Sequence, residues 1–188
     1  MAKKHISQDE LNRILENTRN AQHRLMFRVM AGCGLRSHEL VLMEMKHVDL
    51  EQRYIYIPPQ TSKNHKEGYA VIPESLIPDL KRWMEIRNSY HVEFRYFWTN
   101  QMNFDKPLTT RAVRKAFNMA CKKAGLKEKG YSPHSLRHFC AENMIRHGVD
   151  VNTIMHQLRH SSLAVTQIYL TNNLDERRKT ICAANIQI

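Results

Sequence analysis

Two arginines, two histidines and one tyrosine in this 188-residue chain are of the types that together cleave a phosphodiester without a metal ion: Arg36, His134, Arg137, His160 and Tyr169. A guanidinium group matches the paired oxygens of a phosphate with a planar fork of donors. An imidazole transfers protons near neutral pH, and a phenol can become a covalent nucleophile. The residue types therefore indicate phosphoryl-transfer chemistry, provided that the fold brings them together.

The spacing of His134 and Arg137 favours a shared site. They follow Ser132-Pro133, which is an N-cap followed by a proline at the first helical position. Residues three apart share a helical face, and the N-terminal end of a helix favours anions. The alternative is a surface turn whose charges pair with one another.

Two His-x-x-x-His pairs raise the alternative of a zinc site, His134 with His138 and His156 with His160. Neither pair contains the glutamate of His-Glu-x-x-His, and the neighbouring arginines would repel a dication. We therefore expect no metal ligands and no cofactor.

Arg36 lies in a second motif, Gly-Leu-Arg-Ser-His-Glu-Leu, about a hundred residues upstream. It could present its fork to a phosphate while Glu39 orients it from behind, or the two could form a structural ion pair. Further downstream, Lys63 and Lys66 lie in a polar segment where either could be a solvated turn lysine. Tyr169, taken alone, could be a half-buried packing residue.

Helical and strand patterns describe the elements that must position these residues. Capping residues and apolar spacing predict helices, and two β-branched and aromatic runs around a polar, lysine-bearing loop predict a β-hairpin. The fold class expected is mainly α with a small antiparallel β-sheet (α+β). Helices are expected at about 8–18, 24–31, 35–43, 73–87, 109–124, 133–146, 152–158, 163–169 and 174–184, hairpin strands at 53–57 and 69–72, and a short strand at 94–99.

The composition indicates a folded domain that binds a polyanion. Lys and Arg total 29 against 18 Asp and Glu, a net charge of +11, while the hydrophobic content of 42% is ordinary for a globular protein. Nucleic acid is the commonest polyanion and an anionic membrane the lesser alternative. The four cysteines form no Cys-x-x-Cys pair, so neither a disulfide framework nor a zinc ribbon is indicated. Without an apolar run of about 18 residues, we expect a cytoplasmic protein that does not insert in a membrane.

In order and spacing these segments resemble the catalytic domain of the tyrosine recombinase (phage integrase-like) family, over about residues 7–172. The matching pieces are Gly-Leu-Arg36-Ser-His-Glu39-Leu, Thr-Ser-Lys63-Asn, His134-Ser-Leu-Arg137-His138, and Leu-Arg-His160 with the run that ends at Tyr169.

The resemblance implies a role for each residue. Arg36 and Arg137 would clamp the phosphate, with His160 as a third ligand. Tyr169 would be the nucleophile, His134 its general base and Lys63 the general acid for the leaving oxygen. Glu39 and His138 would support the site from behind. Arg159 stands where the family usually has glycine, and we expect Arg159 and Lys66 to contact DNA.

The resemblance also implies a site-specific recombinase or integrase of prokaryotic, viral or mobile-element origin, acting on double-stranded DNA. Residues 1–188 would form one catalytic domain, with 173–188 as a helical tail. The tail would join subunits into a tetramer on DNA, or it would fold back on its own domain. When free of DNA the protein could be a monomer. The family's N-terminal DNA-clamping domain is absent from these residues, so we expect weak, poorly site-specific DNA binding. Two alternatives are a type IB topoisomerase-like nicking and closing enzyme and a DNA-binding regulator that does no chemistry.

Overall fold

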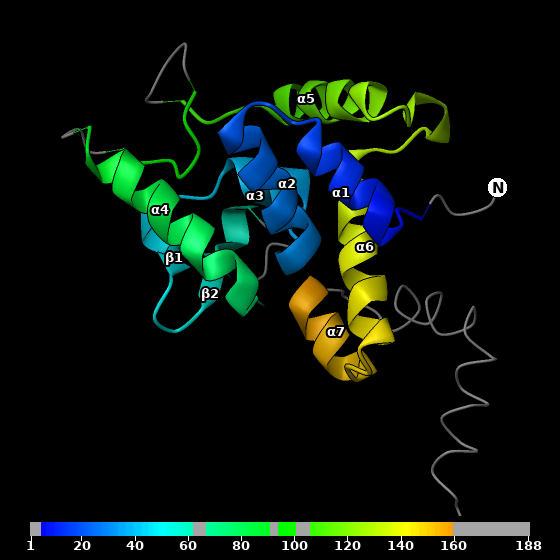
Figure 1. Ribbon diagram of the computed structural model, residues 1–188. Coiled ribbons are helices and arrows are strands. Elements are labelled where there is room, and N and C mark those ends of the chain that lie inside the picture. The colour runs from blue at the N-terminus through cyan, green and yellow to red at the C-terminus, as the bar shows by residue number, and fades with distance from the viewer. Residues whose placement is uncertain (1–4, 62–66, 91–93, 101–105, 160–188) are drawn as a thin grey trace, which may run out of the picture.

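The computed structural model describes residues 5–61, 67–90, 94–100 and 106–159 (Figure 1). Within these ranges the helices are α1 (Gln8–Glu16), α2 (Ala21–Cys33), α3 (Ser37–Val41), α4 (Ile77–Asn88), α5 (Thr110–Lys123), α6 (Pro133–Arg146) and α7 (Val151–Leu158), with 3-10 helices η1 (Met45–His47), η2 (Pro59–Thr61), η3 (Glu74–Leu76) and η4 (Lys127–Lys129). The strands are β1 (Val48–Asp49), β2 (Tyr54–Ile57) and β3 (Gly68–Val71). The fold class expected, mainly α with a small antiparallel sheet, is confirmed.

Local sequence signals set the ends of the first two helices. The Ser7 hydroxyl accepts a hydrogen bond from the Glu10 amide at 3.2 Å, and the Glu10 carboxylate accepts one from the Ser7 amide at 2.9 Å. This is the predicted capping box at the start of α1. Helix α2 is closed at its C-terminal end by Gly34, whose φ of 67° is the left-handed conformation that favours glycine. The chain turns there, and α3 begins at Ser37.

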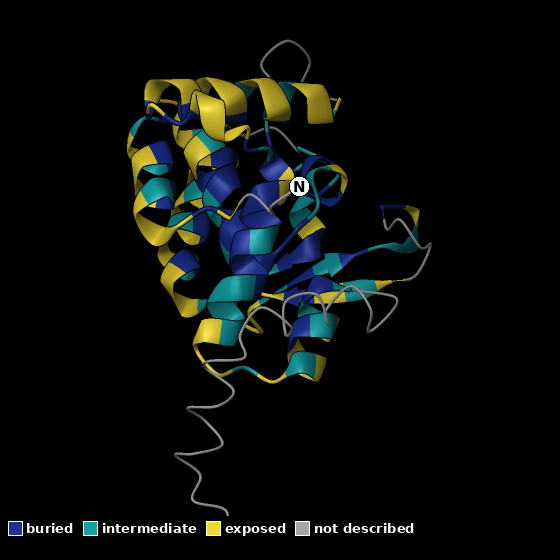
Figure 2. Ribbon diagram, turned by 90° about the vertical axis from the view of Figure 1, so that its right-hand side faces the viewer, coloured by how far each residue is buried: buried dark blue, intermediate teal, exposed yellow. Residues whose placement is uncertain are grey.

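Helix α2 is the centre of the hydrophobic core. Its buried residues are Leu25, Met26, Phe27, Val29, Met30, Ala31 and Cys33. It packs along α6 and also contacts α1, α3 and α5. Figure 2 shows the buried residues gathered in the middle of the molecule, while the outer face of α5, at the top, is exposed. Each large apolar side chain buried here contributes about 1.5–3 kcal/mol, so α2 fixes the positions of the helices around it.

The sheet confirms the predicted hairpin and adds a short strand to it. Its order is β1-β2-β3, antiparallel throughout, with Ile55 opposite Ala70. Strand β2 alternates, so that Ile55 and Ile57 are buried and the two tyrosines between and before them lie on the outer face. Strand β1 is only two residues long, too short to show an alternating pattern in sequence.

The prediction of a strand at 94–99 is wrong. Among the residues that the structure describes there, pairing is limited to one bridge between Tyr96 and Glu44. The Phe97 amide also donates to the Met43 carbonyl at 2.8 Å. The partner segment enters η1 immediately afterwards, so the ladder cannot continue. The aromatic composition that suggested a strand reflects burial instead, since Phe97 is fully buried.

Other expected elements are present with shifted bounds. The helix expected at 35–43 is shorter, and the one expected at 73–87 begins as η3 before α4. The helices expected at 163–169 and 174–184 lie outside the described residues. No helix in the described part of the chain has the length and apolar character needed to cross a membrane.

Helix α7 lies beside the end of α6 and against β3 (Figure 1). Gln157, in its last turn, receives a hydrogen bond from the Val71 amide at 2.9 Å and donates one to the Val71 carbonyl at 2.9 Å. The same side-chain amide donates to the Cys33 carbonyl at 3.3 Å. Gln157 thus occupies the place that a neighbouring strand would take and fixes the end of α7 between the sheet and α2.

Candidate active site

Arg36 stands at the start of α3, directly after the turn that ends α2. It is the N-cap residue of this helix, with φ −75° and ψ 152°. Its neighbour Leu35 is fully buried, which anchors the turn, while 23% of the Arg36 side chain stays exposed. The predicted start of a new helix at Arg36 is therefore confirmed, and part of the side chain is accessible to solvent.

Glu39 is the buried acid of the site. Its side chain is 1% exposed and accepts hydrogen bonds from the Arg36 amide at 2.8 Å and the Arg36 Nη1 at 2.7 Å. Arg159 Nη2 donates to Glu39 Oε2 at 2.7 Å, and Arg137 Nη1 lies 4.0 Å from the same oxygen. Burial raises the pKa of Glu39, but the charge and hydrogen bond of Arg159 and the contacts of Arg36 outweigh it, so the pKa lies below its ordinary value of 4.5. The ionised carboxylate binds Arg36 and Arg159 directly and forms a longer ion pair with Arg137.

Arg137, on α6, joins three elements below the surface. Its side chain is 3% exposed and donates to the Gly34 and Leu158 carbonyls, the residues that end α2 and α7. Burial, with the charges of Arg36 and Arg159, lowers the pKa of Arg137 to about 9, against the opposing effect of Glu39. The group therefore remains cationic at neutral pH.

His134 lies one turn before Arg137 on the same helix. Although His134 as a residue is exposed to solvent, its imidazole packs edge to face against the His138 ring, with ring centroids 4.6 Å apart, and is shielded in part. Partial burial, together with the charges of Arg137 and Arg36, holds the pKa of His134 below its ordinary value of 6.5. A neutral imidazole at pH 7 can accept a proton.

The sequence raised the alternative that the two His-x-x-x-His pairs bind a metal ion. Nowhere in the described ranges do three or more His, Cys, Asp or Glu side chains cluster closely enough to hold a metal ion. The ring contact between His134 and His138 is a packing contact between two side chains one turn apart.

The structure therefore brings together six of the predicted residues from three separate segments: Arg36 and Glu39, His134, Arg137 and His138, and Arg159. The other four predicted residues, Lys63, Lys66, His160 and Tyr169, lie outside the described residues. The chain enters the segment with the lysines after η2 and leaves it at β3, and it reaches His160 directly from Arg159. Three guanidinium groups against one carboxylate give the described part of the site an excess of positive charge, which suits a phosphate.

Two supporting residues were not predicted. His38 Nδ1 lies 3.1 Å from the Thr61 carbonyl, which links α3 to the residue before the lysine-bearing segment. Gln157 fixes the end of α7, as described above. Both are polar residues whose partners are distant in sequence, so spacing along the chain carries no signal for them.

Comparison with known proteins identifies the family of this chain. The model of the phage integrase family matches residues 4–176. Tyrosine recombinase XerC of Escherichia coli O127:H6 (strain E2348/69 / EPEC) is 32% identical over 170 residues, which make up 88% of this chain and 55% of XerC. The chain thus spans about half the length of the curated relatives it matches.

Solved recombinase structures have a fold similar to that of this chain. XerA recombinase superposes with a TM-score of 0.81 at 25% identity, over 100% of this chain and 68% of that chain. The XerH site-specific recombinase bound to its difH substrate, in a pre-cleavage complex, has a TM-score of 0.77 at 25% identity, over 97% of this chain and 54% of the XerH chain. By its family model, its relatives and its fold, this chain belongs to the phage integrase family of tyrosine recombinases.

Proposed function

We propose that this chain is the catalytic part of a site-specific DNA recombinase that cleaves and rejoins DNA through a 3′-phosphotyrosine intermediate. The observation that carries the proposal is the buried Glu39 carboxylate, which holds Arg36 from α3 within 2.7 Å and lies 4.0 Å from Arg137 of α6. These are the two arginines to which the family resemblance gives phosphate binding. A structural ion pair alone would not need a second guanidinium from a helix a hundred residues away.

Each step of the proposed reaction has a residue to perform it. The Tyr169 hydroxyl attacks the phosphorus and passes its proton to His134, and the bond from phosphorus to the 5′ oxygen breaks. Lys63 protonates that leaving oxygen. Arg36, Arg137 and His160 stabilise the charge that gathers on the phosphate oxygens in the transition state. The 5′ hydroxyl of a DNA strand then reverses the reaction and releases the tyrosine.

A nicked suicide substrate tests this proposal. Once the short 5′ fragment diffuses away, the enzyme cannot rejoin the strand, so the wild-type chain should accumulate a covalent protein–DNA adduct. Because guanidinium and imidazole groups supply the charge, the adduct should form equally well in EDTA. Tyr169→Phe should form none, whereas Tyr90→Phe, at an exposed tyrosine after α4, should react like the wild type. An adduct with Tyr169→Phe, or one that requires a divalent metal, would contradict the mechanism.

Two other functions use the same fold. A type IB topoisomerase-like enzyme would relax supercoiled plasmid through the same adduct without exchanging strands between two DNA duplexes. A regulator would bind DNA and form no adduct. Assaying adduct, relaxation and strand exchange on the same preparation distinguishes all three, and the pairing of Arg36 and Arg137 through one carboxylate favours an enzyme.

Double-stranded DNA is the partner that we propose, and the outer face of α5 supports it. Exposed cations follow this face along the helix: Arg111, Arg114, Lys115, Lys122 and Lys123. Such a row of cations suits the phosphate backbone. Lys66, in the segment between η2 and β3, would add a contact beside the cleaved phosphate.

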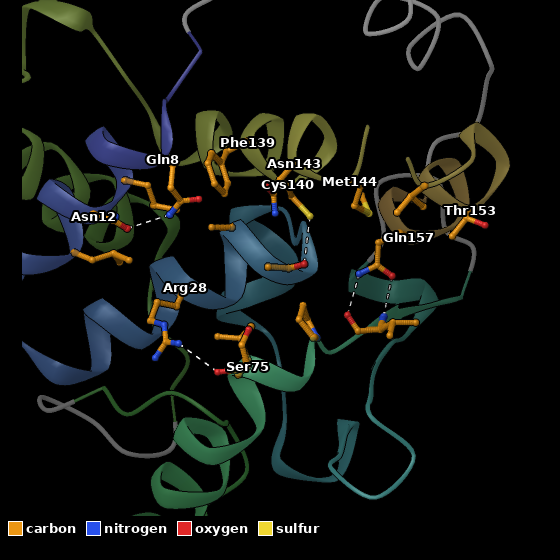
Figure 3. Close-up of a pocket in the computed structure, with 18 residues that line it drawn as sticks. Gln8, Asn12, Arg28, Ser75, Phe139, Cys140, Asn143, Met144, Thr153 and Gln157 are labelled. Atoms are coloured by element: carbon orange, nitrogen blue, oxygen red, sulfur yellow. Dashed lines mark hydrogen bonds between the residues drawn. The ribbon is translucent and has the colours of Figure 1, made fainter. Parts of the chain in front are cut away.

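We also propose that residues 173–188 join subunits into a tetramer on DNA. A groove of about 550 Å³ between α1, α2, α6 and α7 supports this proposal, because it offers an apolar surface to a helix (Figure 3). Leu174, Ile181 and Ala184 would provide the apolar side of the tail. The groove is lined by apolar side chains that include Leu11, Leu15, Ala31, Leu76, Phe139 and Met144.

A cross-link distinguishes docking on a neighbour from docking on the same domain. Asn12 lines the groove and is exposed, and Cys182 is a natural cysteine of the tail. Oxidation of Asn12→Cys on DNA should give disulfide-linked subunits, and Cys182→Ser should abolish them. A disulfide within one chain would contradict exchange between subunits and leave a tail that folds back.

A further inference from the structure

Arg159 adopts a backbone conformation that side chains rarely take. It follows α7 as its C-cap residue with φ 51° and ψ 48°, the left-handed region in which glycine is usual. The side chain is nonetheless only 9% exposed, so most of it is shielded from solvent. A buried arginine at a position suited to glycine indicates that the guanidinium makes contacts that offset the backbone cost.

Those contacts are directed to the site described above. Nη2 donates to Glu39 Oε2 at 2.7 Å and lies 3.4 Å from the Gly34 carbonyl, and Nη1 donates to the Gln157 carbonyl at 2.6 Å. Of the guanidinium nitrogens, Nε has no hydrogen-bond partner among the described residues. Most donors of Arg159 are thus used inside the protein, which leaves little of the fork for a DNA phosphate.

Arg159 also contacts Arg36 directly. Its backbone carbonyl lies 3.4 Å from Arg36 Nη2, while its side chain binds the carboxylate that holds Arg36 Nη1. The guanidinium of Arg36 is therefore held at two points, and Arg159 takes part in the surroundings of both. The first point is the backbone carbonyl of Arg159, and the second is the carboxylate that the Arg159 side chain also binds.

Gly68 leaves the space through which this side chain passes. A Cβ at Gly68, the first residue of β3, would lie 2.7 Å from Cδ and 3.0 Å from Cγ of Arg159. Gly68 does not have a positive φ, so its backbone conformation does not require glycine. Glycine at this position leaves room for the arginine side chain.

We propose that Arg159 is a positioning residue, which holds Glu39 and Arg36 in the arrangement that binds the scissile phosphate, and that Gly68 is the position that admits its side chain. The inference rests on the proposed recombinase function, because the effect of positioning is read from strand cleavage. It differs from a DNA contact by Arg159, which would act on DNA affinity.

Arg159→Gly tests the proposal with little disturbance of the backbone, because glycine prefers the conformation already present. The rate of adduct formation on the suicide substrate at saturating DNA should fall about ten-fold, as for residues that orient a functional ligand from behind. DNA affinity should change much less than the rate, because only the contact with the scissile phosphate is disturbed, and its salt dependence should stay unchanged because Arg159 itself contacts no phosphate. Arg159→Lys keeps the charge but loses the planar fork of donors, so its rate of adduct formation should lie between those of the wild type and Arg159→Gly. Circular dichroism at the assay temperature confirms that each variant is folded.

Gly68→Ala provides an independent test of the contact between Gly68 and Arg159. It should slow adduct formation in the wild-type background, where the new methyl group clashes with Arg159, and have no further effect on Arg159→Gly. Equal effects in both backgrounds would overturn the pairing of the two residues. A loss of DNA affinity and of salt dependence in Arg159→Gly, with the saturated rate unchanged, would overturn positioning in favour of a phosphate contact. A folded wild-type chain that forms no adduct would overturn the proposed function itself.

Discussion

The carbonyl of Gly34 accepts a hydrogen bond from the guanidinium of Arg137, which lies 103 residues later in the chain. Gly34 itself closes α2 by donating its amide to the Met30 carbonyl at 3.1 Å. The residue that ends one helix is thus the residue that orients a side chain of another. The turn from α2 to α3, which carries Arg36, is fixed to α6 at this point.

Substitution of Gly34 should be far more damaging than that of another left-handed glycine. A Cβ at Gly34 would clash with Leu158 and lie 3.3 Å from Cys140 Sγ, whereas one at Gly148 meets nothing within 4 Å. Gly148→Ala should cost about 1–2 kcal/mol for the backbone conformation alone. Gly34→Ala should add about 1–3 kcal/mol for the crowded core. Urea unfolding measures both free energies, and equal losses would contradict the role of the clash.

Glu39→Gln should destabilise the fold because it leaves buried cations without their shared carboxylate. Removal of one partner from a buried ion pair typically costs about 3–5 kcal/mol. Glu74→Gln is the matched control, since Glu74 is 90% exposed and lies 3.7 Å from Arg53. An exposed pair of this kind contributes about 0–1 kcal/mol. Similar free energies of unfolding for the two variants would show that the Glu39 cluster does not stabilise the fold.

The contribution of Glu39 should also depend on pH in a defined direction. Its pKa in the folded chain lies below the ordinary value of 4.5, so the ionised form is favoured by folding. The stabilisation is complete above that value and is lost as the pH falls through the folded pKa. The difference in unfolding free energy between the wild type and Glu39→Gln should therefore be constant near neutrality and shrink below about pH 4.5. A difference that grows in acid would have the wrong sign.

The free protein should hold His134 neutral at pH 7. Partial burial and the charges of Arg137 and Arg36 place its pKa below 6.5. An NMR titration of the histidine ring protons measures this value, and the resonance that disappears in His134→Gln assigns it. A pKa of 6.5 or above in the DNA-free protein would remove the argument that this imidazole is ready to accept the proton of a tyrosine.

Gln157→Ala should loosen the end of α7. The substitution removes the two hydrogen bonds to Val71 and the longer one to Cys33. Each is worth about 0.5–1.5 kcal/mol net, so a loss of about 2 kcal/mol in unfolding free energy is expected. Hydrogen exchange should rise at the Val71 amide, whose partner is lost. Gln52→Ala, at an exposed residue before β2, is the control and should change neither quantity.

Local signals predicted the parts of the fold that depend on near neighbours in sequence. The capping box at Ser7, the left-handed glycine after α2 and the proline that opens α6 all gave element boundaries close to those observed. The segment at 94–99 failed because burial and strand formation favour the same aromatic residues, and only the position of its partner decides between them.

The site shows the same limit. Motif order identified Arg36, Glu39, His134 and Arg137 and predicted that they belong together. The environment of Arg159 could not be predicted, because its contacts with Glu39, Gly34 and Gly68 join positions far apart in sequence. A departure from the family pattern at that position indicated that something differs and left open what the side chain contacts.

The hydrogen bonds between Gln157 and Val71 have a consequence for the solubility of the chain. Strand β3 lies at an edge of the sheet, and Val71 is 60% exposed. An open edge of this kind is a template on which a second chain can add a strand and start aggregation. The glutamine already occupies both backbone groups of Val71, so a second chain could pair there only after displacing α7. The helix that leads to His160 therefore also blocks strand addition at the Val71 position of this edge.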